Sequence, residues 1–315
     1  MAFPDTMKRW DVVVVGEIYA DHVFSGFPRW PAPGEEVHTE HYLRELGGGA
    51  INTACGLARL QRRVRLIGLI GDADREWFTA RLNGFGVSAD GLRSSPLDTG
   101  VTVSVSTAQD RSFYTYRGAN RRLGELLESA SVRTEMTAAR HVHFAMPLAA
   151  ELARNLFPLL HKSGCTTSLD VGFSPDWLQD PANQWTCRAV DYFFPNQAEA
   201  RLLSGDESAE AFRAWAASMD IRHGVIKLGA AGAAGIVRGD LLRVAPPRVE
   251  AVDMTGAGDA FDAGFIDGVL NGEPIEECLR RACICGALCT TRIGALEGLP
   301  DSFSLRSTYE QTYGP

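Results

Sequence analysis

The chain contains 315 residues, of which 45% are hydrophobic and 22% are charged, and it carries a formal net charge of −8. These values are typical of a globular protein with a sizeable core. The acidic balance disfavours nucleic acid as a partner, because nucleic-acid-binding domains present a basic face. No apolar run approaches the roughly 20 residues that a bilayer span requires. The seven cysteines show no CxxC pair, which favours buried, reduced thiols in a cytoplasmic protein without a membrane partner.

The first part of the chain predicts strands and helices in alternation. Residues 11–16 form a short β-branched run that stops at a glycine, as expected for a strand buried on both faces of a parallel sheet. Residues 64–70 repeat this strand-like pattern. Apolar residues recur at helical spacing over residues 50–60 and 74–82. This order indicates an α/β fold.

The middle of the chain has a different pattern. Residues 99–107 and 111–116 alternate small polar and apolar side chains on either side of a turn, which predicts an antiparallel hairpin with one wetter face. The Pro- and Gly-rich residues 24–41 are not helical in pattern. We therefore expect a small β sheet, contributed by about residues 18–45 and 98–118, inserted into the α/β body.

The second half returns to the α/β pattern. Strand-like apolar runs occupy residues 141–144, 167–170, 192–195 and 225–228. Two long helical patterns close the chain, at residues 258–271 and 274–291. We predict a single α/β domain over residues 1–315, with a central, mostly parallel sheet flanked by helices.

The strongest chemical signal is the segment Asp-Met-Thr-Gly-Ala-Gly-Asp-Ala-Phe at residues 253–261. A Gly-Ala-Gly turn runs directly into a helix, so free backbone amides and the helix dipole favour an anion there. Asp259 is a carboxylate within this anion-seeking turn. It could cap the helix, or it could take the proton of a hydroxyl beside a transferring phosphoryl group.

Other polar residues stand where ligands bind in α/β proteins. Asn52 follows three glycines, 47–49, and either caps a helix or contacts hydroxyl groups. Asp21 follows the first strand and is either a solvated loop acid or an acceptor for substrate hydroxyls. Asn196 and Glu199 follow a strand and have the spacing of a capping box.

A Gly-rich loop follows another predicted strand, in the segment Ile-Lys-Leu-Gly-Ala-Ala-Gly. Lys227 is one of only three lysines in the chain, and Gly229 and Gly232 permit a close approach of the backbone to a ligand. Without further support this segment is a flexible loop. The chain has neither the Gly-x-x-x-x-Gly-Lys motif of P-loop proteins nor the third glycine of the dinucleotide fingerprint.

Taken in order, these motifs resemble those of the ribokinase-like (PfkB) carbohydrate kinases. Residues 253–259 match the family's Asp-x-Thr-Gly-Ala-Gly-Asp signature at every defined position, and residues 47–52 resemble its Gly-Gly-x-x-x-Asn signature. The resemblance extends from residue 11 to about residue 300. It implies an ATP-dependent sugar kinase with Mg²⁺ as cofactor, and the inserted sheet then corresponds to a lid that closes over the sugar and often pairs with a second subunit.

The resemblance also implies roles for individual residues. Asp259 would be the base, with charge stabilised by the amides of Gly256, Ala257 and Gly258. The substrate pocket would contain Asp21, Gly47, Gly48 and Asn52. The nucleotide phosphates would lie near Asn196, Glu199, Lys227, Gly229 and Gly232, with Glu199 reaching the metal through water. Residues 289–295 resemble the segment that borders the adenine pocket and, in some members, a monovalent cation.

Departures from the family pattern leave the acceptor sugar open. Residues 170–174 lack the Asn and Arg of the Asp-x-Asn-x-Arg run found in fructokinase-like and ketodeoxygluconate-kinase-like members. Arg117 could pair with a carboxylate or phosphate on the substrate. A nucleoside kinase of the same fold is an alternative, as is a sensor without turnover. A nucleoside would need an aromatic pocket under the lid, for which the candidates are Phe24, Phe27, Trp30, Tyr114 and Tyr116.

Overall fold

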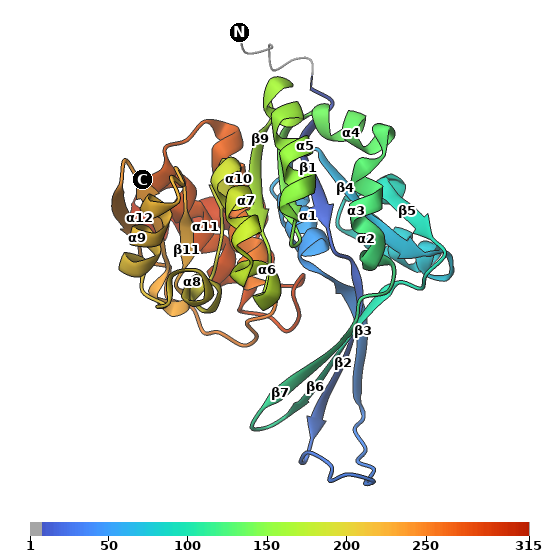
Figure 1. Ribbon diagram of the computed structural model, residues 1–315. Helices are drawn as coiled ribbons and strands as arrows, with labels where there is room; N and C mark the ends of the chain where they lie inside the picture. Colours follow the sequence, from blue (N-terminus) through green and yellow to red (C-terminus); the bar gives the residue numbers. More distant parts are fainter. Residues whose placement is uncertain (1–7, 315) are drawn as a thin grey trace.

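The central sheet consists of six parallel strands. The computed structural model describes residues 8–314, and Figure 1 shows this sheet between layers of helices. In spatial order the strands are β10 (Tyr192–Phe193), β9 (Thr166–Asp170), β8 (Ala139–Ala145), β1 (Trp10–Gly16), β4 (Val64–Gly71) and β5 (Leu92–Ser95). Each neighbouring pair is parallel. The predicted α/β fold with a central parallel sheet is confirmed.

Strand β1 illustrates why the apolar runs form central strands. The four side chains from Val12 to Val15 have no solvent exposure. Successive side chains of a strand point to opposite faces of the sheet. Val12 and Val14 therefore pack into one hydrophobic cluster, and Val13 and Val15 pack into another. A continuous run of valine, rather than an alternating pattern, is what a strand covered on both faces requires.

Helices cover both faces of this sheet. The cluster that contains Val12 and Val14 also includes residues of α1 (Gly49–Arg59), α2 (Arg75–Gly84), α10 (Ala257–Asn271), α11 (Ile275–Cys289) and α12 (Ser302–Tyr313). The cluster that contains Val13 and Val15 includes residues of α3 (Leu123–Glu128), α4 (Ala130–Thr137), α5 (Ala150–Lys162), α6 (Pro175–Gln179), α7 (Gln184–Ala189), α8 (Gln197–Ser204) and α9 (Ala209–Ser218).

A second sheet of four strands projects from the body of the molecule (Figure 1). We call it the small sheet, and its strands in spatial order are β3 (His41–Gly47), β2 (Tyr19–Phe27), β6 (Gly100–Thr107) and β7 (Arg111–Tyr116). Strands β6 and β7 form the predicted antiparallel hairpin. The expectation of a separate small sheet beside the α/β body is confirmed.

The register of the small sheet decides which side chains share a face. Asp21 of β2 pairs with Thr102 of β6, and Thr102 pairs with Thr115 of β7. These three side chains therefore lie on one face of the small sheet, and the residues that alternate with them lie on the other.

A third sheet is antiparallel and consists of β11 (Val225–Lys227), β12 (Ala233–Val237) and β13 (Asp240–Val244). The sequence predicted β11 as a strand of the central sheet, which is wrong in detail. It meets the central sheet through isolated parallel bridges, from Phe193 to Gly224 and from Asn196 to Lys227. Strand β10 has only two residues because helix α8 begins directly after Asn196, so a continuous ladder cannot form there.

The compositional predictions concern cysteines and membrane spans. All seven cysteines are buried and free of disulfide bonds, as predicted. Over the described residues 8–314, no helix is long and apolar enough to cross a membrane.

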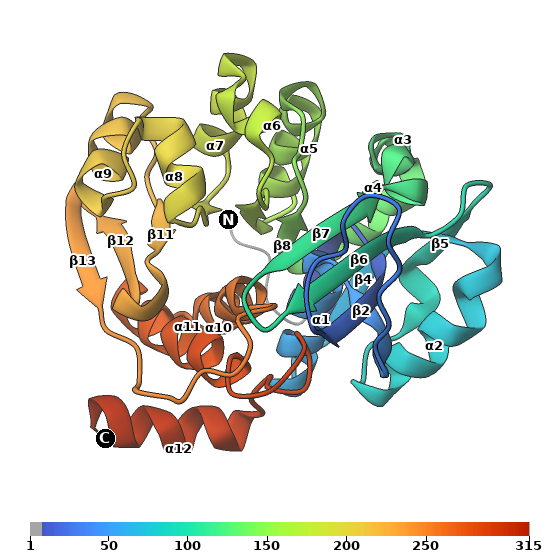
Figure 2. The same cartoon turned by 90° about the horizontal axis from the view of Figure 1, so that it is seen from below.

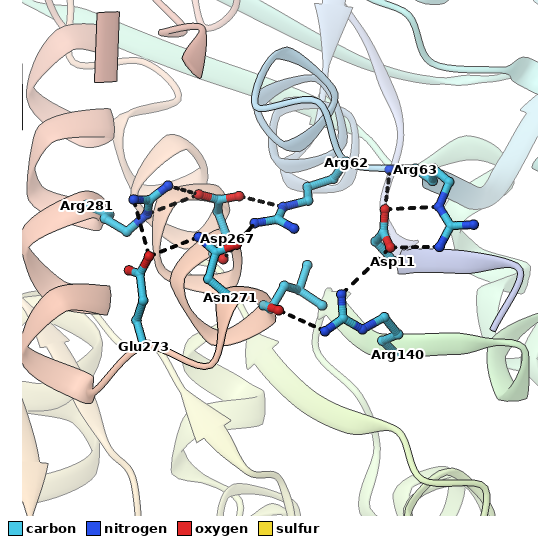
Figure 3. Close-up of polar contacts among 9 residues, drawn as sticks. Asp11, Arg62, Arg63, Arg140, Asp267, Asn271, Glu273 and Arg281 are labelled. Atoms are coloured by element: carbon cyan, nitrogen blue, oxygen red, sulfur yellow. Dashed lines mark hydrogen bonds and ion pairs between the residues drawn. The ribbon is translucent and has the colours of Figure 1, made fainter. Parts of the chain in front are cut away.

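A charged network joins helices α10 and α11. It lies near the C-terminal end of α10, whereas Asp259 lies in the first turn of that helix. Figure 3 shows Asp267 between Arg62, which follows α1, and Arg281 of α11. Asp267 is 2% exposed, and its Oδ1 accepts a hydrogen bond of 2.5 Å from Arg62 Nε. Arg281 Nε donates to its Oδ2 at 3.0 Å. Both arginines therefore share one buried carboxylate, and Arg281 has a second, longer ion pair with Glu273 at 3.5 Å.

We expect Asp267→Asn to lower the free energy of unfolding by about 3 kcal/mol, because the change removes the buried counter-charge that two partly buried guanidinium groups share and leaves Arg281 only its 3.5 Å pair with Glu273. Urea unfolding would measure this loss. A suitable control is Glu125→Gln, which removes an exposed pair with Arg122 and should leave the free energy of unfolding nearly unchanged. Equal effects of the two substitutions would show that the Asp267 network does not stabilise the fold.

Candidate active site

The polar residues of the sequence motifs gather at the carboxyl edge of the central sheet. Strand β9 ends at Asp170, and β1 and β8 end side by side at Gly16 and Ala145. The start of α10 faces this edge, because a Cβ atom on Gly49 would lie 3.0 Å from Asp259 Oδ1 and 3.5 Å from the Cβ of Ala145. This edge is where open α/β sheets bind their ligands.

The turn before α10 is held by Asp253. Its Oδ1 accepts hydrogen bonds from the Thr255 amide at 3.0 Å and the Thr255 hydroxyl at 2.7 Å, and its Oδ2 accepts one from the Gly294 amide at 3.0 Å. Gly256 then adopts a left-handed conformation (φ 76°), which a residue with a side chain rarely takes. The helix begins at Ala257 without a side-chain cap. The Ala257 amide donates to the Met254 carbonyl at 3.3 Å, and the amides that follow it in the first turn can serve an anion.

Asp259 does not cap the helix, so the capping alternative is wrong. It lies in the first turn of α10, and its Oδ2 accepts a 2.8 Å hydrogen bond from Asn52 Nδ2. Burial and the nearby Asp170 carboxylate raise the pKa of Asp259 to about 6, while the Asn52 bond and Lys227 oppose the rise. At neutral pH the carboxylate is mostly ionised, yet basic enough to accept a proton.

Asn52 does not cap a helix either, because α1 begins at Gly49 after an N-cap at Gly48. Its amide nitrogen is used by Asp259, but its buried Oδ1 atom has no hydrogen-bond partner within the described residues. A buried acceptor without a partner is rare in native proteins, so Asn52 Oδ1 is available to a donor from outside the protein.

The glycine run before α1 makes room for two carboxylates. A Cβ atom on Gly47 would lie 2.1 Å from Asp21 Cγ, and one on Gly48 would lie 2.3 Å from the Glu17 carbonyl oxygen. Gly48 also has a φ of 95°. The glycines therefore let Asp21 and Asp259 face the same space. Burial, together with the charges of Asp259 and Glu45, raises the pKa of Asp21 to about 7.

We expect Gly47→Ala to displace the Asp21 carboxylate and to reduce kcat/KM for the acceptor by about 100-fold, while the Kd for ATP stays unchanged. A shift of about 1 Å in a positioning group can have an effect of this size. Steady-state kinetics and ATP calorimetry would measure the two quantities. Gly84→Ala in α2, where an added Cβ meets nothing within 4 Å, is the matched control. A loss of ATP affinity in Gly47→Ala would contradict the expectation.

Lys227 lies beneath the anion-binding turn, surrounded by carboxylates. Its ammonium group forms ion pairs with Asp170 and, at 3.4 Å, with Asp262. Asp170, Asp259 and Asp262 each place one carboxylate oxygen within 4.8 Å of the others. A Cβ atom on Gly258 would lie 3.3 Å from Lys227 Nζ, which places the charge directly behind the turn.

The pKa values of Asp170 and Asp262 are shifted in opposite directions, although Lys227 favours the ionised form of both. Although burial works against it, the Lys227 ammonium lowers the pKa of Asp170 to about 2. Burial and the Asp170 carboxylate hold the pKa of Asp262 well above its usual value, despite the opposing charge of Lys227. The sequence analysis did not single out Asp170 and Asp262 as site residues. The available signals were a carboxylate at a strand end and another three residues after Asp259 in the same helix.

Asn196 and Glu199 form a complete capping box at the start of α8. Asn196 Oδ1 accepts from the Glu199 amide at 3.0 Å, and Glu199 Oε2 accepts from the Asn196 amide at 2.9 Å. Glu199 Oε1 accepts a further bond from Asn196 Nδ2 at 2.7 Å. Burial and the Asp170 charge raise the pKa of Glu199 to about 7. Both oxygens of Glu199 are thus engaged in the cap.

A cavity of about 660 Å³ opens beside the turn. Three of the five residues expected near the nucleotide phosphates line it, namely Lys227, Gly229 and Gly232, together with Ala257 and Gly258 of the turn. Asn196 and Glu199, the other two, are not among its lining residues. The rest of the lining comes from residues between 245 and 251, from α11, from Thr290 in the predicted 289–295 segment, and from Ala230, Met254 and Phe261. Most of this wall is apolar, as a pocket for a flat heterocycle would be.

Arg111, which opens β7, and Arg117, which directly follows β7, reach different partners. Arg117 pairs with Glu17, which follows β1. Arg111, which the sequence analysis did not single out, donates to Thr255 Oγ1 at 3.0 Å and lies 3.4 Å from Asp253 Oδ1. The hairpin therefore contacts the turn of the Asp259 motif.

The aromatic residues of the small sheet do not form the pocket considered for a nucleoside. Phe24 and Tyr114 alternate along their strands with Asp21 and Phe113, so they lie on the face opposite Asp21. Phe27, Trp30 and Tyr114 line a separate cavity of about 220 Å³. Phe113, on the Asp21 face, is 59% exposed. The alternation of the strands thus separates most of these aromatic side chains from the site.

A basic carboxylate beside an uncapped helix start, with a cavity of about 660 Å³ next to it, is the arrangement expected of a small-molecule kinase. The model of the pfkB family of carbohydrate kinases matches residues 10–302. The chain therefore belongs to the pfkB family of carbohydrate kinases, and ATP binding follows from that membership.

Relatives of known activity agree with this assignment. Ribokinase of Arabidopsis thaliana is 29% identical over 308 residues, covering 93% of this chain and 79% of the relative. The 2-dehydro-3-deoxygluconokinase of Bacillus subtilis is 29% identical over 289 residues, with 86% and 88% covered. The structure of Arabidopsis thaliana ribokinase complexed with ribose and ATP superposes with a TM-score of 0.84 at 26% identity, covering 98% of this chain and 99% of that one. These relatives support a sugar kinase as the class of enzyme.

Proposed function

We propose that this protein transfers the γ-phosphoryl group of ATP to a hydroxyl of a sugar or a closely similar polyol, with Asp259 as the base. One observation carries the proposal: Asp259 is held by Asn52 beside free helix amides, and the second polar atom of Asn52 is buried without a partner. A hydroxyl bound there would place its proton next to the carboxylate.

In the proposed reaction, Asp259 accepts the hydroxyl proton as the oxygen attacks the γ-phosphorus atom. The bond between that phosphorus and the β–γ bridging oxygen breaks, and ADP leaves. The amides of Gly256, Ala257 and Gly258 stabilise the negative charge on the transferring group. Positioning of the two reactants contributes the remainder of the rate enhancement.

The acceptor would be held by polar groups on both sides. Asp21 accepts hydrogen bonds from its hydroxyls, and Asn52 supplies the free Oδ1 acceptor. Gly47 and Gly48 provide the space beneath them. Arg117 stays a predicted substrate contact, but it would have to share or leave its pair with Glu17.

ATP would occupy the cavity beside α10, with its phosphates toward Gly229, Gly232 and Gly258. Because the Lys227 charge is already paired with Asp170 and Asp262, we propose that it acts on the phosphates through its position behind the turn. In some pfkB members a monovalent cation lies near the segment that corresponds to residues 289–295. We propose the same region here, where the Gly294 amide binds Asp253.

The carboxylates around the turn fit a magnesium ion, which prefers oxygen ligands. Asp170 and Asp259 present oxygens close together. Glu199, whose oxygens are engaged in the cap, could reach the ion through water, as the sequence predicted. When bound, Mg²⁺ would neutralise phosphate charge and orient the chain of phosphates.

The small sheet would act as a lid over the acceptor, because its Asp21 face is turned toward the site. Closure would exclude water, which otherwise competes for the phosphoryl group. The opposite face carries the exposed Tyr42, Tyr114 and Tyr116. We propose this face as the contact of a homodimer, which sedimentation of the full chain would detect.

A nucleoside as acceptor is supported by one observation, the exposed Phe113 on the Asp21 face. The other aromatic candidates lie elsewhere, which makes the nucleoside the second candidate. The third alternative, a sensor without turnover, gains no support from a site in which the predicted base is held by Asn52.

The decisive experiment is ADP release with Mg-ATP over a panel of pentoses, hexoses, sugar acids, sugar phosphates and nucleosides. We expect turnover with a sugar or sugar derivative and little with nucleosides. Turnover with nucleosides alone would establish the second candidate. Binding of ATP without turnover on any acceptor would favour a sensor, and no binding of ATP would contradict the kinase proposal.

We expect kcat/KM to fall as the pH drops below about 7. Both Asp21 and Asp259 must be ionised to accept hydrogen bonds and a proton, and their raised pKa values of about 7 and 6 place the loss in this range. The decline should steepen below pH 6, where both groups bind protons. Rates measured from pH 5 to 8.5 would test this. Asp21→Asn, which removes one of the two titrating carboxyl groups, is the comparison. A flat profile down to pH 5 would show that neither carboxylate titrates in catalysis.

A further inference from the structure

The Arg111 side chain joins the hairpin of the small sheet to the phosphate-binding turn. Figure 2 shows the hairpin reaching across toward the helices α10 and α11. Arg111 opens β7 opposite Ser106, at the end of the hairpin nearest its turn. Its Nη1 atom donates to Thr255 Oγ1 at 3.0 Å and to Asp253 Oδ1 at 3.4 Å, across more than 140 residues of sequence.

The partner of Arg111 is a fixed, ionised carboxylate. Asp253 is 9% exposed and already accepts hydrogen bonds from Thr255 and from the Gly294 amide. Although burial opposes it, these bonds and the Arg111 charge lower the pKa of Asp253. Arg111 therefore binds Asp253, the carboxylate that holds the turn in shape. It also binds Thr255, which directly precedes Gly256.

The guanidinium is also oriented from the side of the small sheet. It lies 5.8 Å from the centre of the Phe113 ring, on the same face of β7. Its side chain remains 37% exposed, so the contact is formed at the rim of the site and can open. The backbone of Arg111 belongs to the hairpin, and its guanidinium binds the turn. The position of the hairpin and the position of the turn are therefore coupled.

We propose that Arg111 is a positioning residue that fastens the small sheet over the phosphate-binding turn, so that closure over the acceptor and alignment of the turn occur together. This role rests on the proposed phosphoryl transfer. When Arg111 is paired, the hairpin covers the acceptor and water is kept from the γ-phosphoryl group. When it is released, the hairpin can lift, and acceptor and product can exchange.

An ordinary surface ion pair would behave differently. Such pairs contribute little, and their loss leaves the motion of the two partners almost unchanged. A fastening contact instead sets how often the hairpin opens. It also controls the fraction of ATP that is lost to water rather than transferred to the acceptor.

Hydrogen exchange of the protein without ligands tests the contact directly. In Arg111→Gln we expect the amides of β6 and β7 to exchange roughly fivefold faster than in the wild type. Arg111→Lys should restore part of the protection. The matched control is Arg29→Gln, which removes an arginine that pairs with Glu35 in the loop between β2 and β3. Unchanged exchange in Arg111→Gln would overturn the proposal.

Kinetics provides the second readout. We expect Arg111→Gln to raise the KM for the acceptor and to increase the ratio of ATP hydrolysis to acceptor phosphorylation several-fold, with Arg29→Gln unchanged. An unchanged ratio, with only kcat reduced, would overturn the fastening role. The two tests separate the two proposals: if the wild type phosphorylates no acceptor, the proposed function fails, whereas the exchange experiment still decides whether Arg111 fastens the hairpin.

Discussion

Asp259→Asn should reduce kcat by at least about 1,000-fold while leaving ATP affinity within about threefold of the wild type. The substitution keeps the size of the side chain and its place beside Asn52, but it removes the group that accepts the hydroxyl proton. General-base catalysis alone contributes about 100- to 10,000-fold. Single-turnover phosphorylation and ATP calorimetry on the same preparation would measure the two effects.

The matched control for Asp259→Asn is Asp176→Asn, which changes an acid in the first turn of the helix α6. This variant should have wild-type kinetics. If Asp259→Asn kept more than a tenth of the wild-type kcat at pH 7.5, Asp259 would not be the base. Loss of activity together with loss of ATP binding would instead indicate that the turn had changed shape.

Lys227→Met should lower the free energy of unfolding at pH 8 by about 3–5 kcal/mol, the range found when one member of a buried ion pair is removed. The substitution leaves Asp170 and Asp262 buried beside Asp259 without their shared cation. In the wild type the lowered pKa of Asp170 contributes stability at neutral pH that is lost only as the pH falls toward 2. In the variant the uncompensated carboxylate must instead bind a proton.

The pH dependence of this stability deficit distinguishes a loss of the Lys227 charge from a loss of side-chain packing. Since the variant's buried carboxylates favour their protonated forms, its deficit relative to the wild type should shrink between pH 8 and pH 5. Urea unfolding at both pH values would show this. Lys162→Met, at an exposed position of α5, should change stability by less than about 0.5 kcal/mol. A deficit of equal size at pH 5 and pH 8 would mean that the ammonium does not balance these charges.

Local patterns in the sequence were sufficient for much of the fold. A valine run at residues 12–15 is typical of a strand covered on both faces, and alternation over residues 99–107 and 111–116 predicted a hairpin; the structure has both. The Gly-Ala-Gly turn marked the start of α10, because few residues other than glycine adopt the φ of Gly256. Helix α12 was not predicted, because its polar sequence buries little beyond Leu305.

Where the sequence left two possible roles for a residue, only the tertiary structure could decide between them. In the sequence Asn52 and Asp259 both had capping alternatives, since Asn and Asp are favoured at helix starts. They lie 207 residues apart and bond to each other, which no local pattern reveals. Asn196 and Glu199, in contrast, form the capping box that their spacing predicted, because that motif is complete within four residues.

By itself, the sequence determined the parallel α/β fold, the glycine turn before α10 and the chemical types of the groups around it, since each depends on neighbouring residues. Only the tertiary structure decided how charges at distant positions meet. It surrounded Lys227 with Asp170 and Asp262, and it placed Arg111 on the turn. It also turned most of the aromatic candidates of the small sheet away from Asp21, because strand register, and not composition, decides which face a side chain occupies.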